Sequence, residues 1–527
     1  MSQLTVFKPW VPNWAIILIL VFCMLHSMVL LGVYTSNITY AASYLDVEIE
    51  DLQFSLSVTY GTFLATILIE SRLFKFFPTK KYFLSIYSLA AITFFLTAYT
   101  ENYVVFICLR IVEGILMALP WIPLRQLLIT RFKSKNAIII GFSLNYATLL
   151  LASPFIMNIA VWLLENYEWS YMAIGSGVFQ ILCIGLVMLT FNENRFHKKI
   201  PLYQIDWASY ILILLSILTG AFVLVYGEKK YWFESYQILY TTIISITSLG
   251  LFIFRQISSK RPVLDLTIFQ FSNLRTGFFL FIIFYISRTS LNICHTTMLN
   301  IWNWEPMRVA HIQYINVIGN AIGMILAIFM MIRVIPSRII FIIGFGLMTL
   351  FHLWFTFLFI PDIALNNILL PYLIQGISVG ILFVPLVLFT VSSVPSNYAP
   401  FAGTIGVTGR FLGNTLGFCI LQNTQVFLQK THYFKLIQQV SLTDSVTENR
   451  INSTNQLFEN KGFTSEQAHL LSMKQINLVI NKQVFLLSSM ELFTYISYAL
   501  IIILIFLIFN KHLKITFDIV KNSIWGN

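Results

Sequence analysis

Charged residues are scarce in this chain of 527 residues. They make up 10% of it, whereas hydrophobic residues make up 57%, and the mean hydropathy is +0.79. A water-soluble domain needs enough polar side chains to cover its surface, and this composition does not supply them. The sequence therefore excludes a soluble protein and predicts an all-α polytopic membrane protein that lies in a lipid bilayer.

Motifs of the common enzyme chemistries are also missing. The five cysteines lie within apolar runs without a metal-like spacing, so we expect neither a disulfide nor a metal site. The chain has no phosphate loop, no HExxH motif and no clustered His-Asp pair, which argues against a membrane-embedded transferase. We therefore expect no enzyme and no cofactor.

The formal net charge of +11 does not indicate a nucleic-acid partner, because the basic residues lie in short loops between apolar runs. Twenty of the 33 Lys and Arg residues fall in alternate loops, and the loops between these hold most of the acids. By the positive-inside rule the basic loops are cytoplasmic. The pattern predicts that both termini are cytoplasmic.

Apolar runs long enough to cross a membrane occur fourteen times, since a spanning helix needs about 20 mostly apolar residues. They start near residues 13, 56, 81, 102, 136, 168, 206, 235, 274, 309, 337, 364, 399 and 486. No small-residue cleavage site follows the first run, so we expect a retained helix rather than a removed signal peptide. Fourteen transmembrane helices are predicted.

The chain contains a degenerate internal repeat. It pairs RIVEGILMALPWIPL, Arg110–Leu124, with YLIQGISVGILFVPL, Tyr372–Leu386, at a shift of 262 residues that also relates Gly114 to Gly376. A duplicated bundle of membrane helices is typical of secondary transporters. We expect a six-helix bundle in residues 1–200, two inserted linker helices in 201–262 and a second six-helix bundle in 263–527.

One predicted loop is long, from about residue 427 to 483, on the outer side. It is rich in Asn, Gln, Ser and Thr, with helix-like spacing near residues 466–478. Two interpretations are open, a floppy connector and a docking element for a periplasmic partner.

Arg110–Gly114, followed by Pro120 and Pro123, resembles the helix 4 signature of the major facilitator superfamily and, within it, of the fourteen-helix drug:proton antiporters of the EmrB/QacA type. The likeness covers nearly the whole chain and includes Ile205–Trp207 at the start of helix 7, Arg261–Leu266 before helix 9 and Phe401–Gly413 in helix 13.

The resemblance implies a major facilitator fold and a secondary active transporter in the bacterial inner membrane. It further implies proton-coupled efflux of amphiphilic small molecules or drugs, neutral or weakly acidic. Related permeases with the long outer loop work with a periplasmic adaptor and an outer-membrane channel, so these partners are implied as well.

The chain departs from the family pattern in helix 1. The family places an acid shortly before an Asn there, and this chain keeps Asn37 but has Gly32 at the matching position. An alternative function therefore stays open, a proton-independent facilitator or a lipid or fatty-acid transporter of the same fold.

The family's gating motifs are reduced. Of the basic motif between helices 2 and 3 only Lys80 and Lys81 survive, with Glu70 as the nearest acid, and the Gly-Pro motif of helix 5 is reduced to Ser153-Pro154. The resemblance assigns Glu70, Lys80, Lys81 and Pro154 to gating.

Two sets of residues are candidates for proton coupling. Arg110 and Glu113 lie three residues apart, so on a helix they meet on one face and shield each other. They form either a proton carrier tuned by the arginine or a structural ion pair. His26, near the middle of helix 1, either replaces the missing acid or only hydrogen-bonds its neighbours.

Two arginines are candidates for substrate binding. Arg288 falls near the centre of helix 9 with His295 two turns further on, and Arg410 falls one turn before Asn414 in helix 13, whereas no acid occupies the centre of helices 9 to 14. An excess of cations should attract anionic or weakly acidic amphiphiles. The alternative is that the arginines only bond backbone carbonyls. The predicted substrate site also includes Asn37, Tyr372 and Gln375. Arg125, near the inner end of helix 4, is not part of it, and we expect its side chain to extend to the membrane surface.

Overall fold

Helices form nearly all the regular structure of this protein. The computed structural model describes residues 6–27, 29, 45–133, 136–259, 261–392, 394–395, 398–440, 445–510 and 513. Within those residues twelve helices are long and apolar enough to cross a membrane. The only β-type backbone pairing in the same residues is an isolated bridge between Phe7 and Phe191. The prediction of an all-α polytopic membrane protein is confirmed.

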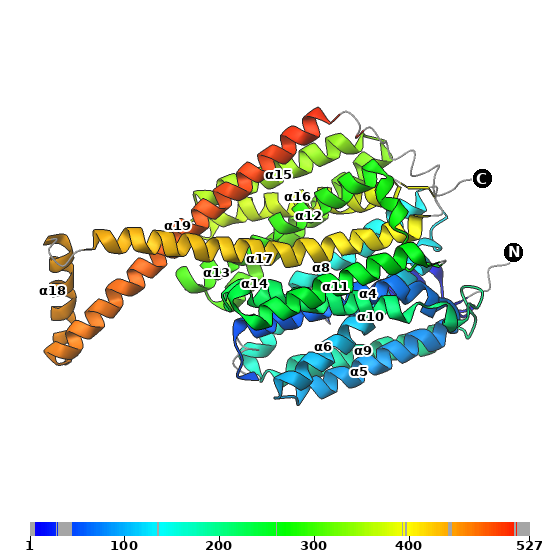
Figure 1. The fold of residues 1–527 in the computed structure, drawn as a ribbon, viewed down its shortest axis with the longest axis horizontal. Coiled ribbons are helices and arrows are strands. Elements are labelled where there is room, and N and C mark those ends of the chain that lie inside the picture. The colour runs from blue at the N-terminus through cyan, green and yellow to red at the C-terminus, as the bar shows by residue number, and fades with distance from the viewer. Residues whose placement is uncertain are drawn as a thin grey trace.

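Most of the long helices lie side by side along roughly one common direction (Figure 1). The chain starts with α1 (Asn13–Met24), α4 (Ile49–Phe76), α5 (Thr79–Ala98), α6 (Tyr103–Ala118), α7 (Trp121–Ile129), α8 (Ala137–Asn166) and α9 (Ser170–Thr190). It continues with η1 (Leu202–Gln204), α10 (Trp207–Tyr226), η2 (Trp232–Glu234), α11 (Tyr236–Ser258) and η3 (Leu266–Gln270). The last part contains α12 (Ser272–Thr289), α13 (Leu291–Thr296), η4 (Thr297–Ile301), α14 (Pro306–Ile332), α15 (Ser337–Thr356), α16 (Asn366–Ser392), α17 (Ala399–Gln439), α18 (Ser445–Glu459) and α19 (Ser465–Phe509).

Twelve of the fourteen predicted runs start within three residues of an observed helix. Two predicted starts are wrong. Helix α4 begins at Ile49 because its polar first turn, with Glu50 and Asp51 and a capping box from Glu48, lies ahead of the apolar run. Helix α19 begins at Ser465 because its polar N-terminal part gives no apolar signal. Helices α1 and α17 occupy the first and thirteenth runs but are not among the twelve spans, so the count of fourteen stays a prediction.

Glycines allow α14 and α16 to approach closely. A Cβ on Gly323 would lie 2.3 Å from the carbonyl oxygen of Ile377, and a Cβ on Gly380 would lie 2.4 Å from that of Asn320. Small residues at such a contact let helix backbones approach closely, and the resulting van der Waals packing is one of the forces that associate helices in lipid. The α14–α16 pair therefore depends on residues without side chains.

The glycine shared by the two copies of the repeat makes the same kind of contact in each. A Cβ on Gly114 of α6 would lie 2.5 Å from the carbonyl oxygen of Thr59 on α4, and a Cβ on Gly376 of α16 would lie 2.4 Å from that of Asn316 on α14. Equivalent helices thus meet through equivalent residues in the two copies.

Gly380→Ala should destabilise the protein by about 1 to 3 kcal/mol, because the new methyl group meets a backbone oxygen that cannot move without separating α14 and α16. The melting temperature of the purified protein in detergent measures this. Gly346→Ala on α15 is the matched control, since a Cβ there meets nothing within 4 Å. Equal melting temperatures for the two variants would contradict the close contact.

Helices α17, α18 and α19 form an extension beyond the end of the bundle. Helices α17 and α19 run past the other helices, and α18 lies at the tip (Figure 1). Ile451 of α18 and Ala468 of α19 are buried, whereas Phe434, Val446 and Leu470 are exposed. The described residues of the predicted long loop are thus mostly helical, which disfavours the floppy-connector alternative.

Candidate functional site

Arg288 and Arg410, both predicted to bind substrate, come together in the structure. The Arg410 guanidinium of α17 lies 6.0 Å from the ring centroid of Tyr60 on α4 and 6.0 Å from that of Tyr285 on α12. Arg288, also on α12, lies within electrostatic range of Arg410 and Tyr285. Cation–π contacts of this kind stabilise a guanidinium where water is excluded.

Further aromatic rings join these residues. Tyr146 of α8 meets Phe383 of α16 with 4.9 Å between ring centroids, and Tyr285 lies 6.1 Å from the same Phe383. Helices distant in the sequence thus meet here, α4 and α8 from residues 1–200 and α12, α16 and α17 from residues 263–527. We call this set the Arg–Tyr cluster; it consists of Tyr60, Tyr146, Tyr285, Arg288, Phe383 and Arg410.

The Arg–Tyr cluster carries an excess of positive charge. None of the ion pairs found among the described residues includes Arg288 or Arg410. Flat apolar rings beside unpaired guanidinium groups suit a ligand with an apolar body and a negative head. Sequence reasoning missed the tyrosines, because nothing distinguishes them among the 24 Tyr and 48 Phe of the chain. Tyr285 could have been found, since it lies one helical turn before Arg288.

Arg125 corrects an expectation. Instead of snorkelling to the membrane surface, its side chain is buried, with the guanidinium 4.5 Å from the Phe142 ring centroid. It also lies beside the Tyr146 hydroxyl. The physical reason is that α7 packs against α8 inside the protein, so the side chain has no open path to the lipid headgroups.

Three other predicted substrate residues form a separate polar seam among α13, α14 and α16. His295 Nε2 lies 2.5 Å from Gln313 Nε2, and Asn316 donates to the backbone oxygen of Tyr372 at 3.1 Å and to the side chain of Gln375. These contacts hold helices together. The structure therefore divides the predicted substrate residues into two groups.

The last two predicted substrate residues are less informative. Asn414 is half-buried on α17, one turn after Arg410. Asn37 lies outside the described residues.

Arg110 and Glu113 form a buried ion pair on α6, with both side chains fully removed from solvent. The backbone oxygen of Arg110 accepts a hydrogen bond of 3.2 Å from the Thr59 hydroxyl of α4. Each side chain compensates the charge of the other, and such pairing is how buried charges inside membrane proteins are usually accommodated.

His26 is completely buried and held at both ring nitrogens. Its Nδ1 lies 2.6 Å from Gln180 Oε1 of α9, and its Nε2 lies 3.1 Å from the backbone oxygen of Leu116 on α6. The ring also packs edge-on against Tyr87 at 5.0 Å. Both ring nitrogens contact oxygen atoms of neighbouring helices, as the hydrogen-bonding alternative for His26 predicted, and the proton path proposed below does not include it.

The predicted gating residues lie at different depths. Glu70 is completely buried on α4, and neither of its carboxylate oxygens has a hydrogen-bond partner among the described residues. Lys80 and Lys81 lie on the first turn of α5, half-buried and exposed respectively.

Pro154 lies inside α8. The Asn158 side chain donates to the backbone oxygen of Pro154 at 2.8 Å and to that of Ala310 on α14 at 3.0 Å. A proline inside a helix removes a backbone hydrogen bond, so this contact between α8 and α14 is a suitable place for bending.

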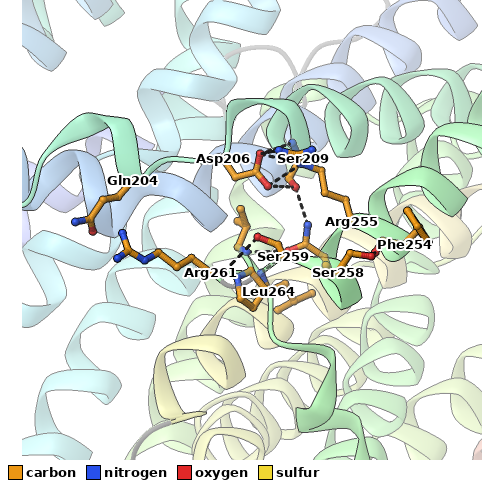
Figure 2. Close-up of polar contacts among 12 residues, drawn as sticks. Gln204, Asp206, Ser209, Phe254, Arg255, Ser258, Ser259, Arg261 and Leu264 are labelled. Atoms are coloured by element: carbon orange, nitrogen blue, oxygen red, sulfur yellow. Dashed lines mark hydrogen bonds and ion pairs between the residues drawn. The ribbon is translucent and has the colours of Figure 1, made fainter.

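A polar brace joins the two inserted helices at the end of the bundle predicted to be cytoplasmic (Figure 2). Arg255 of α11 donates two-pronged hydrogen bonds to Asp206 at 2.9 to 3.0 Å. Partial burial works to raise the pKa of the Asp206 carboxyl, but hydrogen bonds from Arg255 and Ser209 outweigh it and hold the pKa below its ordinary value. The carboxylate is therefore ionised at neutral pH, and the Arg255 contact is a full ion pair.

The brace also fixes the chain segments on either side of the inserted helices. Gln256 donates to the Ser209 hydroxyl at 2.8 Å and accepts from the backbone N–H of Val263 at 2.8 Å. Arg72 of α4 donates to the backbone oxygens of Gln204 at 2.7 Å and Pro262 at 3.3 Å. Two of the segments that carry the family resemblance therefore meet in this brace, namely Ile205–Trp207 and Arg261–Leu266.

Comparisons with known proteins agree with this architecture. Residues 16–418 match the Major Facilitator Superfamily. The probable multidrug resistance protein EmrY of Escherichia coli is 23% identical over 441 residues, which cover 80% of this chain and 81% of EmrY. The multidrug export protein EmrB of Haemophilus influenzae is 21% identical, with 77% of both chains covered. The fatty acid resistance protein FarB of Neisseria gonorrhoeae is 22% identical, with 73% of both covered.

The fold agrees with a solved structure as well. A crystal structure of tetrameric PepTSo2 superposes with a TM-score of 0.59 at 14% identity, covering 94% of this chain and 98% of that chain. At this identity the likeness shows the fold alone. Since the family match spans most of the sequence, the chain belongs to the major facilitator superfamily and is an EmrB-type, multi-pass transporter of the inner membrane.

Proposed function

We propose that this protein exports amphiphilic small molecules, neutral or weakly acidic, in exchange for protons. The observation that carries the proposal is the Arg–Tyr cluster, in which helices distant in the sequence converge on two arginines without ion-pair partners. Rocking of a bundle in residues 1–200 against one in 263–527 would open the cluster to alternate sides of the membrane. We place both termini in the cytoplasm.

A weak acid with a long apolar body fits the cluster best. The guanidinium groups of Arg288 and Arg410 would bind a carboxylate, and the rings of Tyr285 and Phe383 would pack on the apolar part. Two of the similar proteins are named for multidrug resistance or export and one for fatty acid resistance. Those names support an amphiphilic substrate for this chain too.

The proton gradient is large enough to drive such export. One charge that moves through 100 mV is worth about 2.3 kcal/mol, which supports a concentration ratio of roughly fifty-fold. In our proposal Glu113 takes and releases a proton during the cycle, and Arg110 tunes its proton affinity. The buried pair between them is the geometry that such a role requires.

The second candidate is a proton-independent facilitator or a fatty-acid transporter of the same fold, which the name of FarB and the absence of an acid at Gly32 favour. Adding a carboxylate amphiphile to the purified protein in weakly buffered detergent solution separates the two. The antiporter should release protons when the substrate binds. A pH that stays constant at saturating substrate would favour the facilitator.

We further propose that the extension of α17, α18 and α19 docks a periplasmic adaptor that leads to an outer-membrane channel. The extension projects from the bundle (Figure 1) and exposes Val446 and Leu470. At its base lies a groove of about 460 Å³ between α17 and α19, lined on its aromatic side by Tyr433, Phe434 and Phe485. Exposed apolar surface outside the membrane is typical of a protein interface.

A further inference from the structure

The carboxyl group of Glu70 lies in a place that does not suit a negative charge. Its side chain on α4 is completely buried, roughly 9 Å from the end of the helix at Phe76 by the rise of 1.5 Å per residue. Neither oxygen accepts a hydrogen bond from any described residue. An ionised carboxylate without hydrogen bonds loses its hydration and gains nothing in return. The neutral acid is the form that this environment tolerates.

Charged and titratable groups face Glu70 from several elements without contacting it. The strongest electrostatic influences are Arg125 of α7 and Lys75 on its own helix, and Tyr82 of α5 is also within range. None of the ion pairs among the described residues joins any of these groups to Glu70. On α10, Tyr210 lies 3.2 Å from the hydroxyl of Thr66, one turn before Glu70.

Arg125 connects this acid to the Arg–Tyr cluster. Its guanidinium stacks on Phe142, and it lies beside the hydroxyl of Tyr146. Tyr146 in turn packs on Phe383. A movement of Arg125 toward Glu70 would therefore change the surroundings of Tyr146, so protonation at one end of this path and ligand contacts at the other end are physically linked.

We propose that Glu70 is a proton-binding site of the transport cycle, neutral in the conformation seen here and ionised in the conformation that admits water from the end of α4. In that second conformation the carboxyl O–H bond breaks, the proton passes to water, and the carboxylate pairs with Arg125. The inference rests on the proposed function, namely export in exchange for protons, and adds Glu70 to Glu113 as a second proton-binding site.

Glu113 provides the matched comparison. It is equally buried, but Arg110 lies in contact with it as an ion-pair partner. Glu113 is therefore ionised in the same conformation in which Glu70 is neutral. The two acids should differ in any measurement that detects a protonated carboxylic acid.

Infrared spectroscopy of the purified protein near neutral pH tests the protonation state directly. We expect a carbonyl stretch of a protonated carboxylic acid that Glu70→Gln abolishes and Glu113→Gln leaves in place. Absence of the band from the unmutated protein, or its persistence in Glu70→Gln, would overturn the inference. Glutamine has the shape and charge of the neutral acid, so Glu70→Gln should fold, and Glu70→Asp should keep the band.

Transport in proteoliposomes then separates this inference from the proposed function. Glu70→Gln should reduce the stimulation of export by a pH gradient at least about tenfold while downhill flux of substrate persists, and Glu70→Asp should restore part of the stimulation. If the unmutated protein shows no stimulation, the proposed function fails. If the unmutated protein and Glu70→Gln are stimulated equally, the role of Glu70 fails and the proposed function survives.

Discussion

Arg410→Ala should reduce export of a long-chain carboxylate by roughly ten- to hundredfold. The Arg410 guanidinium lies over Tyr60 and Tyr285 without an ion-pair partner among the described residues, so its charge is available to a ligand. A hydrogen bond to a charged group is worth about 1.5 to 3 kcal/mol, and each 1.4 kcal/mol corresponds to a factor of about ten. Initial export rates from everted membrane vesicles, divided by the amount of inserted protein, measure the effect.

Two controls identify the cause of such a loss. Arg410→Lys keeps the charge and should retain part of the export. Arg308→Ala removes an arginine that also stacks on an aromatic ring, with its guanidinium 4.3 Å from Trp304, but this arginine is exposed on α14. It should export normally. Normal carboxylate export by Arg410→Ala would show that the arginine only bonds backbone carbonyls, which is the alternative that the sequence left open.

Arg110→Leu should destabilise the protein by about 3 to 5 kcal/mol, because it leaves the Glu113 carboxylate buried without its partner. The double variant Arg110→Leu with Glu113→Leu should recover most of this loss, since it removes both charges and fills the space with apolar groups. Thermal unfolding of the purified proteins in detergent gives both values.

An exposed ion pair supplies the control for this comparison. Lys430 and Glu228 lie 3.1 Å apart near the base of the extension, with the lysine side chain 66% exposed. Lys430→Leu should change the melting temperature little, because solvent screens exposed pairs. If the double variant is as unstable as Arg110→Leu, the loss comes from packing and not from an unpaired charge. If the stable double variant also loses stimulation by a pH gradient, the pair acts in proton coupling.

Hydropathy predicted the part of the fold that lies in lipid, because only helices in lipid need long apolar runs. The helices that fill the membrane start where the apolar runs start, but α4 and α19 begin earlier, because polar turns outside the membrane carry no apolar signal. The extension was predicted as a long polar loop with helix-like spacing only near residues 466–478, because its helices are rich in polar residues and expose apolar ones such as Val446 and Leu470.

The candidate site was predictable where a charge stands alone in an apolar run. That rule found Arg288 and Arg410, and the spacing of Arg110 and Glu113 indicated their contact on one face of a helix. It could not single out Tyr60 or Tyr146, because the chain has 24 Tyr and 48 Phe and most aromatic residues of a helix bundle face lipid or the core. Nor could it distinguish the paired Glu113 from the unpaired Glu70, which depends on neighbours brought together by the fold.

The central claim is that this protein couples outward movement of a carboxylate amphiphile to inward movement of protons through the Arg–Tyr cluster. The most direct measurement is the accumulation of a labelled carboxylate amphiphile in proteoliposomes of purified protein under an imposed pH gradient. We predict accumulation above the external concentration, which a protonophore abolishes and Arg410→Ala prevents. Equilibration to equal concentrations at the same rate with and without the gradient would contradict the account.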